Sequence, residues 1–139
     1  MARLQYLADT SVFSRLTKPV VASTFARLVA GRLVAVSAPV IFELGFSARS
    51  RGDYREMMDG LAAFPTVPTG DADHRRALEV QSQLASRSRH RALSLVDALV
   101  AAVAEARELI VLHYDSDFET VSKLTGQEHR WIVARGSAD

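Results

Sequence analysis

The chain has 139 residues, of which 48% are hydrophobic, so its length allows one domain with a single core, over residues 1–139. Its 17 basic and 16 acidic residues give a net charge of +1, which neither requires nor excludes nucleic acid as a partner. The absence of cysteine excludes a disulfide framework, a thiolate zinc site and a cysteine nucleophile. Because the N-terminus has no apolar signal core and no uncharged run reaches about 18 residues, we expect a soluble, cytoplasmic protein.

The first half of the chain alternates short apolar runs with helical patterns. The apolar runs at residues 4–8 and 33–36 predict strands. Asp9, Thr10 and Ser11 directly follow the first run and predict a tight turn into a helix. Apolar residues at helical spacing, bounded by proline or glycine, predict three further helices, at residues 20–30, 37–46 and 52–63.

The second half continues this alternation. Prolines flank residues 64–68, which can form at most a short edge strand. Asp71 or Asp73 is expected to cap a long polar helix that runs to about Ser86, and a basic loop follows at residues 87–91. The remaining patterns predict a helix, a central parallel strand, a helix and a final strand, at residues 95–106, 109–113, 114–124 and 131–133. The order of elements predicts an α/β domain whose central parallel sheet, of about five strands, is covered by helices on both faces.

The most apolar of these helices carries one conspicuous charge. From Leu95 to Ala104 nine of ten residues are apolar, and the exception is Asp97. A helix that is apolar on every face is buried, and a buried carboxylate needs a partner. No basic residue lies in this segment, so the partner must come from elsewhere in the fold or be a bound cation. A local alternative stays open, because Ser94 and Asp97 match a capping box with Ser94 as the N-cap.

Acidic residues are expected to gather at one edge of the sheet, because sites in such sheets form outside the carboxyl ends of the strands. Asp9, Asp115 and Asp117 directly follow predicted strands, where capping of the next helix is the alternative role. Glu43 and Asp97 lie about one turn into apolar helices. Carboxylates gathered in this way repel one another unless a cation lies among them. An all-oxygen ligand set without cysteine suits Mg²⁺ or Mn²⁺.

Four segments carry a resemblance to a known family. They read LADTSV at residues 7–12, SAPVIFEL at 37–44, DALVAAVA at 97–104 and HYDSDF at 113–118. In this order and at these intervals they resemble the PIN-domain family, most closely the VapC-type toxin ribonucleases of bacterial toxin–antitoxin pairs. The resemblance covers nearly the whole chain, from about residue 4 to residue 133.

The resemblance implies a five-stranded parallel sheet and a Mg²⁺- or Mn²⁺-dependent endoribonuclease, usually a homodimer, that a cognate antitoxin holds inactive. The family's catalytic and metal-binding acids fall on Asp9, Glu43, Asp97, and Asp115 or Asp117. Its small polar residue falls on Thr10 or Ser11, which we group with the residues that contact RNA. His113 and Tyr114 stand where such proteins often have a pair beginning with threonine, which leaves the choice between Asp115 and Asp117 open.

Roles within this implied site follow from the chemistry of phosphodiester hydrolysis, in which a metal ion activates water and stabilises charge. We expect Asp9 and Asp97 to bind the principal ion and Glu43 to bind it through water or to orient the attacking water. We expect Asp115 or Asp117 to support this ion or to hold a second one. Without metal, the site should repel RNA.

Arginine side chains are the expected contacts to the RNA backbone. The basic loop supplies Arg87, Arg89 and Arg91. Further candidates are Arg49, Arg51, Arg75 and Arg76. For any one of them a solvated surface position is the alternative. The four histidines show no metal-binding spacing and receive no role, and Trp131 is expected in the core or an interface.

Two other functions are compatible with the same fold. A catalytically inactive domain that binds RNA or protein is one, although acids at all the matched positions oppose it. A receiver-type phosphoacceptor is the other, but it requires a lysine near the end of the last strand, and the only lysines are Lys18 and Lys123. For an antitoxin, apolar grooves between the helices at residues 20–30 and 52–63 are the expected docking surfaces. The RNA and its cut site are not determined by the sequence.

Overall fold

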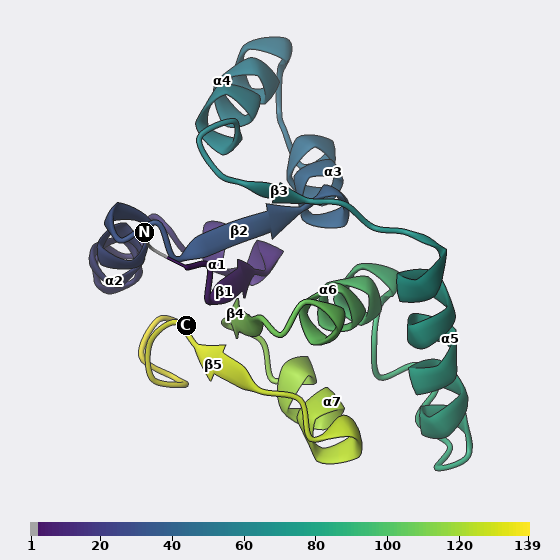
Figure 1. The fold of residues 1–139 in the computed structure, drawn as a ribbon. Coiled ribbons are helices and arrows are strands. Elements are labelled where there is room, and N and C mark those ends of the chain that lie inside the picture. Colours follow the sequence, from purple (N-terminus) through teal and green to yellow (C-terminus); the bar gives the residue numbers. More distant parts are fainter. Residues whose placement is uncertain (1–2) are drawn as a thin grey trace.

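A computed structural model describes residues 3–139 of the chain (Figure 1). Within these residues the helices and strands alternate as expected, and β1 and β4 are shorter than the apolar runs that predicted them. In chain order they are β1 (Tyr6–Ala8), α1 (Thr10–Phe13), α2 (Pro19–Ala30), β2 (Val34–Ser37), α3 (Ala38–Phe46), α4 (Arg51–Leu61), β3 (Thr66–Val67), α5 (Asp71–Ala85), α6 (Leu95–Ala106), β4 (Ile110–His113), α7 (Asp117–Thr125) and β5 (His129–Trp131).

The five strands form one parallel sheet in the order β3-β2-β1-β4-β5. Strand β1 is central, and Leu7 pairs with Ala35 on one side and with Val111 on the other. Strand β3 forms the edge and has only two residues, as expected for a segment between two prolines. The predicted α/β fold with a five-stranded parallel sheet, and β4 as an inner strand, is confirmed.

Helices pack on both faces of the sheet. Helix α6 contacts β4 and β1, and α2 lies on the opposite side of the strands (Figure 1). The core between them includes Leu7, Val36 and Leu112, whose side chains are fully buried. Each such side chain contributes roughly 1.5–3 kcal/mol of hydrophobic stabilisation. This packing fixes the sheet and therefore the positions of the loops that follow its strands.

Helix α6 is buried only in part. Residues 99–104 are buried, but Leu95 is 70% exposed and Asp97 is half-buried, because the first turn projects beyond the sheet. The expected burial of the whole segment is therefore wrong for its first turn. Within residues 3–139, no helix has the length and apolar character needed to cross a membrane.

Two local predictions are corrected by the structure. Helix α5 has Gly70, not Asp71 or Asp73, at its N-cap, and the Asp73 carboxylate accepts the Gly70 N–H at 2.9 Å from inside the first turn. Strand β5 lies two residues earlier than expected, because its pairing with β4 ends where His113 faces Trp131. Ile132, directly after β5, is buried in the core, and its N–H still donates to the His113 carbonyl of β4 at 2.8 Å.

Candidate metal centre at the carboxyl edge of the sheet

Asp9 ends β1 and caps α1. Its Oδ2 accepts hydrogen bonds from the Ser11 N–H at 3.0 Å and from the Ser11 hydroxyl at 2.6 Å. The side chain is only 2% exposed, yet its Oδ1 has no hydrogen-bond partner in the described part of the chain. An unpartnered buried polar atom costs about 1–3 kcal/mol, so this oxygen is suited to a ligand.

Ser11 connects the ends of two neighbouring strands. Its hydroxyl donates to Asp9 and accepts the backbone N–H of Tyr114, just after β4, at 2.8 Å. Thr10, the other candidate for the small polar residue, has a buried hydroxyl oxygen without a partner among residues 3–139. Of these two, Ser11 is therefore the residue that holds the first acid in place.

Asp115 is oriented by a buried histidine that the sequence analysis left without a role. Its backbone N–H donates to His113 Nδ1 at 3.1 Å, so the proton of this imidazole is assigned to Nε2, which lies 2.8 Å from His129 Nδ1. Burial, together with the adjacent His129, lowers the pKa of His113 to about 3, so the ring is neutral. The only sequence signal was a histidine at the end of an apolar strand.

Asp97 approaches from the other side of the centre, in the first turn of α6. Ser94 is the N-cap of this helix, and its hydroxyl accepts the Asp97 N–H at 3.1 Å. The predicted N-cap at Ser94, with the Asp97 N–H as its donor, is therefore confirmed. It does not account for the Asp97 carboxylate, which faces other acids.

Three carboxylates from three separate segments converge here. One oxygen each from Asp9, Asp97 and Asp115 lies within 4.8 Å of the other two. Asp117 lies just outside this group, at the start of α7, and its N–H donates to Asp115 Oδ1 at 2.9 Å. Glu43 is half-buried on α3 and is also outside the group, which we call the acidic centre.

The electrostatics of the acidic centre favour a positive ligand. Burial, together with the neighbouring carboxylates of Asp9, Asp115 and Asp117, raises the pKa of Asp97 to about 8. Burial also raises the pKa of Asp9, although its hydrogen bonds with Ser11 oppose this. Near neutral pH the centre is therefore stabilised by a proton or a cation. Its oxygen-only ligands and the bare Asp9 Oδ1 fit a hard divalent cation.

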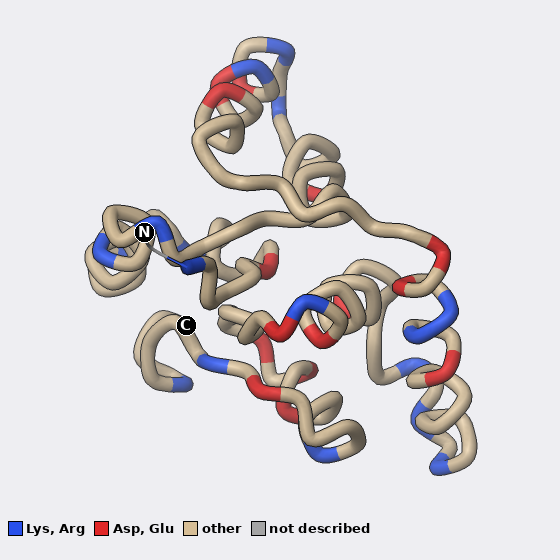
Figure 2. The backbone as a smooth tube through the Cα atoms, viewed as in Figure 1, with Lys and Arg blue, Asp and Glu red and all other residues tan. Residues whose placement is uncertain are grey.

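The arginine side chains considered for RNA lie in different settings. Arg87, Arg89 and Arg91 are exposed in the loop between α5 and α6, and Arg49, Arg51 and Arg75 are also exposed. Arg76 instead pairs with Glu105 of α6 at 2.7 Å, so it has a structural partner. Figure 2 shows basic and acidic segments interspersed on α4 and α5, and acidic segments at the end of β1 and on α6 and α7.

An apolar groove lies between α3 and α4. It is lined by Ile41, Phe42, Phe46, Tyr54 and Met58, and Phe42 and Phe46 are 76% and 85% exposed. Helix α4 was one of the two helices expected to form docking grooves. The groove next to it is formed with α3 rather than with α2, because α3 and α4 pack against each other.

Comparison with known proteins gives a consistent family. The model of the PIN domain matches residues 6–124. Over 136 residues the chain is 40% identical to ribonuclease VapC51 of Mycobacterium tuberculosis, covering 98% of both chains.

Solved structures share the fold. The chain matches DNA-bound VapBC from Salmonella typhimurium with a TM-score of 0.77 at 16% identity, over 94% of this chain and 100% of the other. It also matches VapBC-5, a member of the VapBC family of toxin–antitoxin systems from Mycobacterium tuberculosis, with a TM-score of 0.64 at 23% identity. This match covers 95% of this chain and 100% of the other. The family match spans most of the chain and agrees with the resemblance carried by the four segments. The chain therefore belongs to the PIN domain family, and its relatives within that family are VapC-type proteins.

Proposed function

We propose that this protein is a metal-dependent endoribonuclease and the toxin of a toxin–antitoxin pair. The observation that carries the proposal is the acidic centre, in which three carboxylates lie within 4.8 Å of one another without a basic partner among residues 3–139. The 40% identity to a protein named as a ribonuclease supports the reaction. The likeness to structures of toxin–antitoxin complexes supports the biological role.

Asp9, Asp97 and Asp115 are the residues that would hold the ion, which we propose to be Mg²⁺ or Mn²⁺. Such an ion supplies an activated water, a polarised phosphoryl oxygen and charge stabilisation of the leaving oxygen. The proximity of Asp115 to the other two acids favours it over Asp117 as the fourth acid of the family pattern. Asp117 remains in the proposal as a support, because its backbone N–H binds Asp115.

Other side chains position these acids or the reacting water. Ser11 orients Asp9, and because its single hydroxyl proton goes to this acid, we assign it to positioning rather than to RNA contact. Neutral His113 orients Asp115 through the backbone N–H. Glu43, outside the group of three, keeps the role of orienting the attacking water or binding the ion through water.

The proposed partners are RNA, an antitoxin protein and a second copy of the chain. Arg87, Arg89 and Arg91 are exposed and free to contact phosphates from a loop that leads into the Asp97 helix. Thr10 keeps its proposed RNA contact because it lies next to Asp9; its hydroxyl oxygen is buried without a partner among residues 3–139, so this contact requires the side chain to rotate. The apolar groove between α3 and α4 is the surface we propose for the antitoxin. We also propose that residues 1–139 form a single domain.

Cleavage of a total RNA pool by the purified protein tests this function. We expect discrete products with Mg²⁺ or Mn²⁺, no products with EDTA, and no products from Asp97→Asn, which keeps side-chain size but removes the charge. Asp59→Asn, at an exposed position of α4, is the matched control and should cleave like the parent. If folded protein does not cleave, the nuclease proposal fails and an inactive binding domain takes its place. If it cleaves equally after Asp97→Asn, the acidic centre is not the site of the cleavage.

A further inference from the structure

A polar cavity of about 520 Å³ adjoins the acidic centre. It is lined by Asp115 of that centre and by Ser11, which binds Asp9, and its other walls come from the segment between α1 and α2, from the turn after β4, and from β5 and the segment that follows it. Its main lining side chains are Ser11, Arg15, Tyr114, Asp115, Trp131 and Arg135. Anything bound in this cavity is therefore next to the proposed reacting centre.

Arg15 is the one cation of this cavity whose side chain has no acidic or hydrogen-bonding partner among the described residues 3–139. The other, Arg135, donates to Glu119 at 3.1 Å. Arg15 is half-buried, and its guanidinium carbon lies 4.5 Å from the centroid of the Tyr114 ring. A guanidinium stacked on an aromatic ring keeps its edge donors available for a planar or tetrahedral anion.

The ring that supports Arg15 is rigidly held. The Tyr114 hydroxyl donates to Asp139 Oδ1 at 2.7 Å and accepts the backbone N–H groups of Gly136 and Ala138 at 2.9 Å each. Because Tyr114 follows β4 directly and its own N–H binds Ser11, the platform is fixed relative to Asp9. Arg15 is therefore preorganised, and binding an anion there costs little ordering.

The cavity is not built to stack a nucleobase. Trp131 is its largest ring, but Arg135 lies 5.5 Å from the ring centroid, and the rings of His113 and Tyr114 lie at 5.0 and 5.2 Å. Its indole N–H is used by Glu119 at 3.0 Å. Asp115 and Asp139 also line the cavity, and they keep their charge although they accept hydrogen bonds from the Asp117 N–H and the Tyr114 hydroxyl. A divalent cation held by Asp115 would offset part of this charge, and Arg15, unpaired among residues 3–139, is the cation that remains for a phosphate.

We propose that this cavity is a second phosphate subsite, in which Arg15 binds the RNA phosphate next to the one that is cleaved. This inference rests on the proposed nuclease function. Arg15 would align the strand so that the neighbouring phosphodiester reaches the acidic centre. Because this contact is made before and during the reaction alike, its loss should raise KM and leave kcat nearly unchanged.

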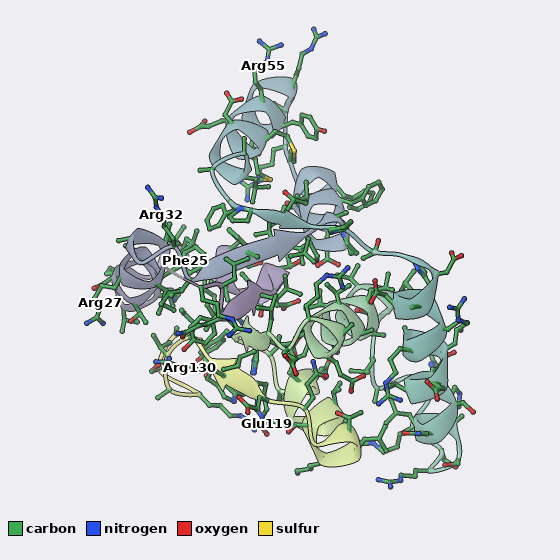
Figure 3. The ribbon with its side chains drawn as sticks, in the orientation of Figure 1. Phe25, Arg27, Arg32, Arg55, Glu119 and Arg130 are labelled. Atoms are coloured by element: carbon green, nitrogen blue, oxygen red, sulfur yellow. The ribbon has the colours of Figure 1, made fainter. Side chains whose placement is uncertain are left out.

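The test uses an RNA that spans a site first mapped by wild-type cleavage of total RNA. We compare wild type with Arg15→Gln, Arg15→Lys and Arg130→Gln. Arg130 of β5 is the control because its guanidinium carbon also lies over a tyrosine ring, 5.6 Å from the Tyr6 centroid, but it does not line the cavity (Figure 3). Unlike Arg15 it also donates to the tyrosine hydroxyl, at 2.6 Å. Binding is followed by fluorescence anisotropy of the labelled RNA, and kcat and KM by product formation.

We expect Arg15→Gln to weaken binding and raise KM by about tenfold, as for loss of one charged hydrogen bond. Arg15→Lys should lose less, because it keeps the charge but not the forked geometry. The slope of log K against log salt should fall by about 0.7 for Arg15→Gln, the value for one phosphate of a single strand. Replacing the adjacent phosphate by a neutral methylphosphonate should make wild type bind like Arg15→Gln.

Each contrary result has a distinct meaning. If wild type cleaves and Arg15→Gln behaves like Arg130→Gln, the subsite is wrong and the nuclease function stands. If wild type cleaves no RNA, the proposed function fails and the subsite fails with it. Thermal unfolding of each variant separates loss of binding from loss of fold, and a normal KM for folded Arg15→Gln protein also contradicts the proposal.

Discussion

Two aspartates of this protein are almost equally buried but differ in charge environment. Asp9 and Asp73 are 2% and 5% exposed, and each accepts a backbone N–H at the start of a helix. Asp73 also faces Arg107, with 3.6 Å between the carboxylate and guanidinium. Asp9 instead faces Asp97 and Asp115 and keeps one oxygen without a partner in residues 3–139. Burial of a carboxylate does not by itself indicate a metal site, whereas burial without a neighbouring positive charge does.

The largest expected difference between the two aspartates is in catalysis. Asp9→Asn should lower kcat/KM for RNA cleavage by about 10²-fold or more, because it removes one charged ligand from the acidic centre. Asp73→Asn should keep nearly wild-type activity in the folded protein. Both are measured on the same RNA with Mn²⁺ at equal concentrations of folded enzyme. Equal losses of kcat/KM in Asp9→Asn and Asp73→Asn would contradict the proposed difference between these two aspartates.

Metal binding should separate the same pair without any reliance on activity. Mn²⁺ at about 100 times its dissociation constant should add about 2.7 kcal/mol to the free energy of unfolding of wild type. The gain should persist in Asp73→Asn and largely disappear in Asp9→Asn. Thermal unfolding with and without Mn²⁺ measures it, with Ca²⁺ and Mg²⁺ as comparison ions. If Asp9→Asn keeps the increase in unfolding temperature with Mn²⁺, the ion binds somewhere other than the acidic centre.

The pH dependence of stability should show the unbalanced charge of the acidic centre directly. In the folded protein the pKa of Asp97 is raised from 3.8 to about 8, so folding takes up a proton between these values. Stability from this group is full below about pH 4 and is lost as the pH rises towards 8. Neutral burial of His113 gives the opposite slope up to about pH 6.5, so the Asp97 effect is clear above that pH. Metal-free protein should therefore unfold at a lower temperature at pH 8 than at about pH 6.5. Asp97→Asn should flatten this trend, and an unchanged slope in that variant would exclude Asp97 as its cause.

The smallest expected effect is on the structural side of the comparison. Asp73→Asn removes the ion pair with Arg107 but keeps an oxygen for the Gly70 N–H, so it should cost about 1 kcal/mol of stability. Arg107→Ala should cost somewhat more, since it also removes the 2.8 Å hydrogen bond to the Pro68 carbonyl. Denaturant unfolding measures both. If Asp73→Asn instead stabilised the protein, Asp73 would be in a repulsive charge environment like that of Asp9, and the contrast between the two aspartates would be wrong.

The sequence predicted much of this protein because much of it is encoded locally. Apolar runs of strand length became β1, β2 and β4, and helical spacing located α2, α3, α4 and α6 within a few residues. The order of strands and helices was sufficient for a parallel α/β sheet. The predictions were wrong where local patterns are ambiguous, at the N-cap of α5 and at the bounds of β5. At β5 the apolar residue Ile132 was included in the predicted strand, but it is a buried residue that follows the strand.

The sequence also identified the acids, but it did not rank them. Asp115 and Asp117 are two residues apart and equally plausible along the chain, and only the turn held by His113 brings Asp115 to the other acids. Glu43 and Asp97 looked alike, each a lone acid in an apolar run, yet only Asp97 joins the group of three. His113 itself was missed, because a buried hydrogen-bonding role leaves no spacing pattern.

Local conformation and the faces of helices and strands follow from periods of a few residues, which can be read along the chain. Contacts between distant segments depend instead on strand order and register, which no short period records. Ser11 and Tyr114 are separated by 103 positions, and the stacking of Arg15 on Tyr114 joins the same two regions. The kinds of chemical group at the acidic centre were thus determined by the sequence. Which of them meet, and what lies beside them, was decided by the pairing of β1 with β4.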